Sequence, residues 1–120
     1  AAANATLDYV LEHDLQKQAA VVGRLLLDGL RESVGDLPAV AEVRGKGLMI
    51  GIEFVLPGTL DPDPAVAAAA LEATRERGLL VGKGGLYGNC LRVAPPLTLG
   101  EADAREGLRM LTDAVRFACA

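Results

Sequence analysis

The first third of the chain has the hydrophobic spacing of an amphipathic helix. Apolar residues recur there every three or four positions and form one stripe, which packs a helix against a core. The stripe consists of Leu15, Ala19, Val22, Leu26 and Leu30. Polar residues near Glu12 and His13 interrupt the pattern, so we expect two helical pieces with a bend, the second capped by Asp14. Gly35 and Pro38 are predicted to end the second piece.

The segment VRGKGLMIGIEFV, residues 43–55, alternates with the period of two that is typical of a strand. One face is apolar and predicted to be core; it consists of Leu48, Ile50, Ile52 and Phe54. The other face is mixed, and we expect it to meet solvent or another domain; it consists of Met49, Gly51, Glu53 and Val55. Gly45 and Gly47 predict a turn or bulge with unusual backbone angles.

A second helix start lies in the middle of the chain. Asp63 is a natural N-cap, and Pro64 suits the first helical position, where its missing N–H is not needed. This helix is predicted to run to about Arg77 and to stop at Gly78.

The last third predicts two short strands and a final helix. The strands are LLVG, residues 79–82, and CLRVA, residues 90–94, with a glycine-rich loop between them. Thr98 and Glu101 have the spacing of a capping box, which predicts where the last helix begins. The core face of that helix consists of Ala104, Leu108, Leu111 and Val115.

The order helix, strand, strand, helix, strand, strand, helix predicts an α+β fold. We expect a small, mainly antiparallel sheet of about four strands with helices packed on one face. At 120 residues, the chain is long enough for one domain with its own core, spanning 1–120.

Composition and charge exclude several classes of partner. A net charge of −4 without a basic run argues against nucleic acid, and no apolar run approaches the roughly 20 residues that span a bilayer. Two cysteines, Cys90 and Cys119, are too few for a disulfide framework and predict a reduced, cytoplasmic setting. The chain begins without methionine and inside a predicted helix, so we expect it to be a piece of a longer protein.

The loop GKGGLYGN, residues 82–89, raises the question of a phosphate site. A Walker-type loop needs a glycine five residues before its Gly-Lys pair and Ser or Thr after the lysine, but Arg77 and Gly84 stand there. A dinucleotide fingerprint needs a third glycine, where GKGLMI has Ile50 and GKGGLY has Tyr87. These glycines are therefore predicted to make turns rather than to bind ATP or NAD.

Arg92 is the best candidate for chemistry. If Leu91 and Val93 face the helices, Arg92 projects from the opposite, open face of the sheet. A guanidinium on a rigid strand suits bidentate binding of a carboxylate. The alternative is a surface arginine paired with Glu53, and spacing alone favours this alternative. No catalytic triad or metal-ligand spacing accompanies Arg92, and Lys83 is predicted to be an ordinary loop lysine.

Two motifs carry a resemblance to a known family. VRGKGLMIGIEF, followed by GLLVGKGGLYGNCLRVAPPLTL and a final helix, resembles the C-terminal small domain of class III aminotransferases. These are fold-type I enzymes that depend on pyridoxal 5'-phosphate, and the loop is most similar to the alanine–glyoxylate and omega-amino-acid branch. The opening residues resemble the helix that leads out of the large domain, so residues 1–12 are expected to be the end of an interdomain helix.

The resemblance implies roles for several residues. In this family, the arginine at the position of Arg92 binds the substrate carboxylate, so the resemblance favours that reading. Gly45 and Gly47 would shape the turn before the strand. The loop facing the active site would be shaped by Gly82, Gly84, Gly85 and Gly88.

The resemblance also implies what the chain lacks. The Schiff-base lysine of the family lies in a large domain that is missing here, and Lys17, Lys46 and Lys83 match no motif that would give them this role. The expected function is a small-domain fragment of an aminotransferase that moves an amino group between an amino acid and a 2-oxo acid. The fragment alone is expected to be inactive and to form a homo-oligomer. The alternatives are a stand-alone domain that binds small carboxylates and a structural or dimerising domain.

Overall fold

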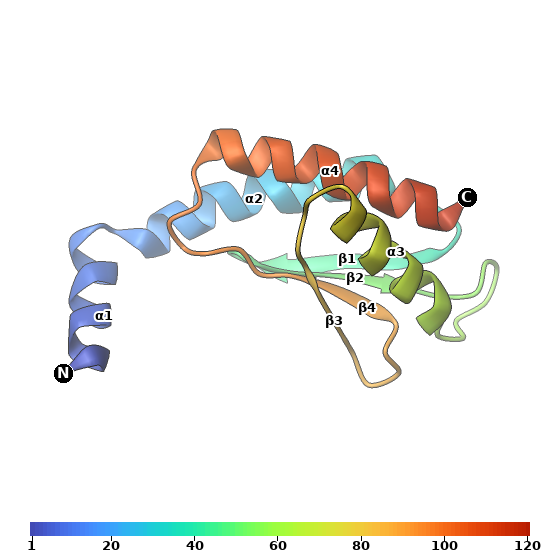
Figure 1. The fold of residues 1–120 in the computed structure, drawn as a ribbon, viewed down its shortest axis with the longest axis horizontal. Helices are drawn as coiled ribbons and strands as arrows, with labels where there is room; N and C mark the ends of the chain where they lie inside the picture. The colour runs from blue at the N-terminus through green and yellow to red at the C-terminus, as the bar shows by residue number, and fades with distance from the viewer.

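The computed structural model describes all 120 residues as four helices and four strands (Figure 1). In chain order these elements are α1 (Ala2–Glu12), α2 (Leu15–Val34), β1 (Val40–Lys46), β2 (Met49–Phe54), α3 (Pro64–Glu76), β3 (Gly82–Gly84), β4 (Cys90–Val93) and α4 (Glu101–Cys119).

The four strands form one antiparallel sheet in the order β1-β2-β4-β3. Helices α2 and α3 contact the strands, and α4 packs on both of these helices. All three lie on the same side of the sheet, and no helix covers the other side (Figure 1). The predicted α+β fold is therefore confirmed, and we call the uncovered side the open face.

A single cluster of 18 buried residues lies between the helices and the sheet. The sheet contributes side chains that are at most 1% exposed, namely Ile50, Ile52, Phe54 and Leu91. The predicted stripe of α2 is buried along its whole length, from Leu15 to Leu30. The alternation predicted for residues 48–54 is therefore confirmed, because the apolar face is core and Met49 is 65% exposed.

Helix α2 approaches the β1–β2 hairpin more closely than a side chain would allow. A Cβ atom on Gly23 would lie 2.1 Å from the carbonyl oxygen of Gly47. Gly47 itself has a φ of +56°, in the left-handed region that glycine adopts without steric cost. The turn predicted here from Gly47 is confirmed, and the two glycines let backbone meet backbone.

Two predicted helix caps are wrong. Asp14 stands at the start of α2, but its backbone is left-handed, with φ +49°, and its side chain makes no capping hydrogen bond. Helix α4 begins after Gly100 rather than after Thr98, and no side chain caps it. Thr98 lies too far before the first turn for its hydroxyl to reach an unpaired N–H.

Two predictions on the strands also need correction. Only Gly82–Gly84 pairs with β4, whereas Leu79 and Val81 pack against the core instead of continuing the ladder. Val55 is 6% exposed rather than part of the mixed face. The chain leaves the strand after Phe54, where the N–H of Val55 donates to the Ala39 carbonyl at 3.0 Å, and this ends the alternation.

Helix α1 leaves the body of the molecule, and none of its residues is buried (Figure 1). Leu7 and Leu11 are more than half exposed. At its end, the His13 ring stacks on Tyr9 with centroids 4.0 Å apart, and His13 Nδ1 lies 3.0 Å from the Tyr9 carbonyl oxygen. An isolated helix of this length is marginal in water. The exposed Leu7 and Leu11 give α1 an apolar surface suited to a partner.

None of the helices combines the length and the hydropathy that crossing a bilayer requires.

The predicted cap of α3 is confirmed and can be tested. Asp63 is 7% exposed, and its carboxylate accepts the N–H groups of Ala65 at 3.0 Å and Val66 at 3.1 Å. Asp63→Ala should lower the free energy of unfolding by about 1–2 kcal/mol, because these N–H groups lose their acceptor. Thr98→Ala, a matched control at the position that caps nothing, should change it by less than about 0.5 kcal/mol. Urea denaturation measures both, and equal losses would contradict this assignment of the caps.

Candidate functional site

Strand β4 places Arg92 on the open face. Leu91 is 0% and Val93 8% exposed in the core, while Arg92 points to the other side and is exposed. The period of two along a strand dictates this arrangement once the helices cover one face. The orientation expected for these three residues is therefore what the structure has.

Glycines stand on both sides of Arg92 across the sheet. The register aligns Arg44 of β1, Gly51 of β2, Arg92 of β4 and Gly82 of β3 in one row. A Cβ atom on Gly82 would lie 3.3 Å from Arg92 Nε, and one on Gly51 would meet nothing closer than 3.9 Å. The guanidinium thus lies against bare backbone on one side and open space on the other.

A shallow hollow of about 370 Å³ lies over this row. Its polar lining includes Arg44, Arg92 and Cys90, and glycines of β1, β2, β3 and the β3–β4 loop make up much of the rest. The Arg92 guanidinium in this hollow suits a small anion, and the planar fork of arginine favours a carboxylate.

Glu53 pairs with Arg44 and not with Arg92. The Arg44 guanidinium donates to Glu53 at 2.5 Å and to Glu42 at 3.1 Å. The hydrogen bond with Glu53 raises the pKa of Arg44 above its ordinary value. Arg92 has no ion pair or side-chain hydrogen bond within the chain. The alternative prediction, a surface arginine paired with Glu53, is therefore wrong for Arg92.

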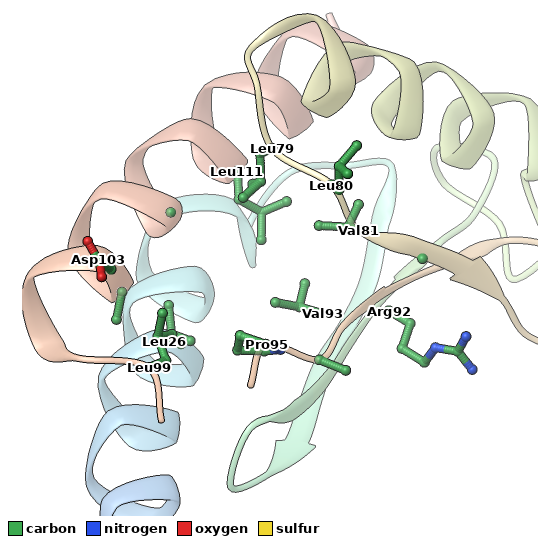
Figure 2. A pocket seen from close by; sticks show the side chains of 14 residues that line it. Leu26, Leu79, Leu80, Val81, Arg92, Val93, Pro95, Leu99, Asp103 and Leu111 are labelled. Carbon is green, nitrogen blue, oxygen red and sulfur yellow. The ribbon is translucent and has the colours of Figure 1, made fainter. Parts of the chain in front are cut away.

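A second hollow, of about 350 Å³, lies between the helices and the end of β4. Leucines, Val81 and Val93 make up half of its lining residues, with Asp103 at one side (Figure 2). The Arg92 side chain borders this hollow, but its guanidinium points away from it (Figure 2). The apolar hollow is thus separate from the polar surface where Arg92 could bind an anion.

The glycine-rich loop between β3 and β4 is a tight turn. Gly85 and Gly88 have φ angles of +87° and +66°, and the N–H of Gly88 donates to the Gly85 carbonyl at 3.1 Å. Asn89 is 2% exposed, and its side-chain amide donates to the Phe54 carbonyl at 2.8 Å, which ties the loop to β2. A strand rather than a helix follows the loop, so no helix N-terminus is available here to hold a phosphate.

Three contributors to this site were not predicted from the sequence. Arg44 was not singled out, although its spacing from Glu42 puts both side chains on one face of a strand. Asn89 carried no signal, because its partner lies 35 residues away. Gly51 was placed on the mixed face, but its position between two arginines depends on how the strands pair.

The lysines of the chain do not fit pyridoxal phosphate. Lys17, Lys46 and Lys83 are all exposed, and none lines either hollow. A lysine that forms an imine with this cofactor needs an enclosed site that favours its neutral amine. No group of three or more His, Cys, Asp or Glu residues stands close enough to hold a metal ion.

Comparison with known proteins decides the family. The model of the family named Aminotransferase class-III matches residues 1–115. The chain belongs to the class-III aminotransferase family. The resemblance found in the sequence is therefore confirmed.

The match to each relative covers most of this chain but only a part of the relative's own length. The chain is 36% identical over 116 residues to an alanine/serine racemase of Pyrococcus horikoshii, covering 97% of this chain and 24% of that protein. It is 37% identical to a mitochondrial alanine–glyoxylate aminotransferase 2 homolog of Arabidopsis thaliana, covering 83% of this chain and 21% of that protein. A solved aminotransferase of Bacillus anthracis superposes with a TM-score of 0.86 at 34% identity, covering 92% of this chain and 26% of that one. The class-III aminotransferase chain thus spans about a quarter of the length of these relatives.

The glycines around the site should differ in how they tolerate a methyl group. A Cβ atom on Gly45 would lie 2.5 Å from the Met49 carbonyl oxygen and 2.9 Å from Ile50 Cα, and neither backbone atom can turn aside. Gly45→Ala should therefore lower the free energy of unfolding by about 1–3 kcal/mol. Gly51→Ala, the matched control in the facing strand, should change it by less than about 0.5 kcal/mol. Thermal unfolding followed by circular dichroism compares the two, and a larger loss for Gly51→Ala would contradict the register.

Proposed function

We propose that this chain is the small domain of a longer aminotransferase that depends on pyridoxal phosphate. The whole enzyme would move an amino group between an amino acid and a 2-oxo acid. Membership of the class-III family supports this proposal. The coverage supports it as well, because the chain matches only about a quarter of the length of each relative. Residues 1–12 would be the end of the helix that joins the small domain to the large one, since α1 leaves the body and buries none of its residues.

Arg92 would bind the carboxylate of the substrate. The observation that carries this role is the free guanidinium on the open face, held by a rigid strand between two glycines. Two parallel N–H···O bonds would fix both the position and the plane of a carboxylate. Binding at this point would hold the rest of the substrate in one orientation, which lowers the entropy cost of reaction.

The glycine-rich loop would face the active-site cleft beside Arg92. Gly82 and Gly84 belong to β3, next to Arg92 and Cys90 of β4, and Gly85 and Gly88 turn the chain. Without side chains at these positions, a substrate could approach the backbone closely. These glycines would therefore leave room for the substrate rather than bind phosphate.

The cofactor would bind to the part of the enzyme outside this chain. Pyridoxal phosphate acts as an electron sink in amino-group chemistry, and its lysine must come from elsewhere because the three lysines here do not fit. The small domain would contribute carboxylate recognition and the wall of the cleft. Homo-oligomerisation and a cytoplasmic location stay predictions.

The free arginine on the open face also fits one alternative function. A stand-alone domain that binds small carboxylates would also need an unpaired arginine on an open face. It would not need α1, whose exposed Leu7 and Leu11 favour contact with a further protein surface. Mass spectrometry of the protein from its source separates the two proposals, because a heavier chain that contains this sequence supports the aminotransferase.

The purified 120-residue chain should not hold the cofactor by itself. Mixed with pyridoxal phosphate and then dialysed, it should keep no visible absorbance and show no aminotransferase activity, because all three of its lysines are exposed. Absorption spectroscopy and an assay with alanine and glyoxylate measure both properties. A stoichiometric visible band that disappears on replacing one lysine would sink this proposal.

In the whole enzyme, Arg92→Ala should lower kcat/KM for carboxylate substrates by roughly 30- to several-thousand-fold. Truncating one partner of a desolvated charge pair costs about 2–5 kcal/mol, and ~1.4 kcal/mol corresponds to a factor of ten. Arg92→Lys should recover only part of the loss, since an ammonium lacks the planar fork. Amines without a carboxylate are the control in these steady-state kinetics and should react at an unchanged rate. If Arg92→Ala slowed both kinds of substrate equally, Arg92 would have a structural role only.

A further inference from the structure

Glu53 lies between two arginines on the open face, and only one of them holds it. In the register of the sheet, Glu53 stands opposite Glu42 on one side and Cys90 on the other. Arg44 follows Glu42 by two residues, and Arg92 follows Cys90 by two residues, so both arginines are diagonal neighbours of Glu53. Diagonal neighbours on one face of a sheet are within reach of long side chains.

The carboxylate of Glu53 is held by Arg44. Nη1 of Arg44 donates to Glu53 Oε2 at 2.5 Å and to Glu42 Oε2 at 3.1 Å. The two carboxylates face each other directly and would repel without this bridge. Glu53 is also the more enclosed of the two, with its side chain 33% exposed against 58% for Glu42, so it has less water available to replace a lost partner.

Without Arg44, Arg92 would be the remaining arginine next to Glu53. The other cation of β1 on this face, Lys46, lies at the far end of the hairpin, opposite Met49. Gly51 stands between the two arginines in their shared row and adds no side chain that would block Glu53 from turning. An intramolecular carboxylate would then compete with the substrate for the guanidinium of Arg92.

We propose that Arg44 is a positioning residue, which keeps Arg92 free for its ligand by holding Glu53 away. This inference rests on the proposed carboxylate-binding role of Arg92 and assigns a second residue to it. The apparent affinity of a ligand falls with the fraction of binding sites that are free. An exposed ion pair favours its paired state by roughly 1.4- to 5-fold. Competition from Glu53 should therefore raise the apparent Kd for a carboxylate about two- to sixfold.

The 120-residue chain itself allows the test. Sodium propanoate serves as the probe, and the Nε–Hε signal of Arg92 in a ¹⁵N NMR spectrum reports on binding, assigned by its loss in Arg92→Lys. In Arg44→Gln, the Kd for propanoate should rise two- to sixfold, and the ligand-free Arg92 signal should move toward its bound position. Adding Glu53→Gln should restore both values. Glu53→Gln alone should leave the Kd within about twofold, because Arg44 already holds that carboxylate.

A matched control removes an arginine from a similar pair elsewhere. Arg105 pairs with Glu101 at 2.7 Å on α4, with its side chain 64% exposed, on the helical side of the molecule. Arg105→Gln makes the same change in net charge and should alter neither the Kd nor the Arg92 signal. Circular dichroism confirms that each variant is folded.

Three results would overturn the proposal. First, the Kd and the Arg92 signal could stay unchanged in Arg44→Gln. Second, the double variant could bind as weakly as Arg44→Gln. Either result would indicate that Arg44 has a merely structural role. Glu53→Gln alone could tighten binding as much as Arg44→Gln weakens it, which indicates a general effect of charge. If propanoate moved no Arg92 signal even in the unchanged protein, the binding role of Arg92 would be wrong. A shift of the ligand-free Arg92 signal in Arg44→Gln that Glu53→Gln reverses would still support the role of Arg44 as the residue that holds Glu53.

Discussion

The sheet can bury only one of its faces, because α2 and α3 lie against the same side and α4 packs on them. Every strand residue is thereby assigned to the core or to the open face by the period of two. Ile52 and Leu91 are completely buried, while Gly51 and Arg92, their neighbours along the strands, are turned the other way. The hydrophobic burial that stabilises the fold thus also determines which charged groups share a surface.

Glycine has two distinct functions in this domain. Gly23 and Gly47 allow a helix and a turn to approach until backbone meets backbone, so they belong to the packing of α2 on the hairpin. Gly51 and Gly82 are in regular strands with no positive φ, and what matters is the space beside Arg92. The first pair stabilises the domain, whereas the second pair leaves a surface on which a small ligand could reach the guanidinium.

The two arginines of the open face differ in whether a carboxylate pairs with them. Arg44 is neutralised by two carboxylates and Arg92 by none, although both belong to one row of the sheet. Exposed ion pairs contribute little to stability, so we interpret the pair between Arg44 and Glu53 by its proposed effect on Arg92. A class-III aminotransferase that takes its lysine from another part of the protein would need this domain for recognition rather than for chemistry at the cofactor.

Local pattern in the sequence determined the helical stripe of α2, the buried face of residues 48–54, the Asp63 cap and the direction in which Arg92 points. Each of these follows from a periodicity or a hydrogen bond within a few residues. Tertiary structure alone decided that Glu53 pairs with Arg44, that Gly82 lies beside Arg92, that Val55 is buried and that β3 begins at Gly82. These features depend on how strands pair, across the β1–β2 hairpin for Glu53 with Arg44 and between distant segments for Glu53 with Cys90. The energy of such pairing lies in the register and in cross-strand contacts, which no local pattern contains.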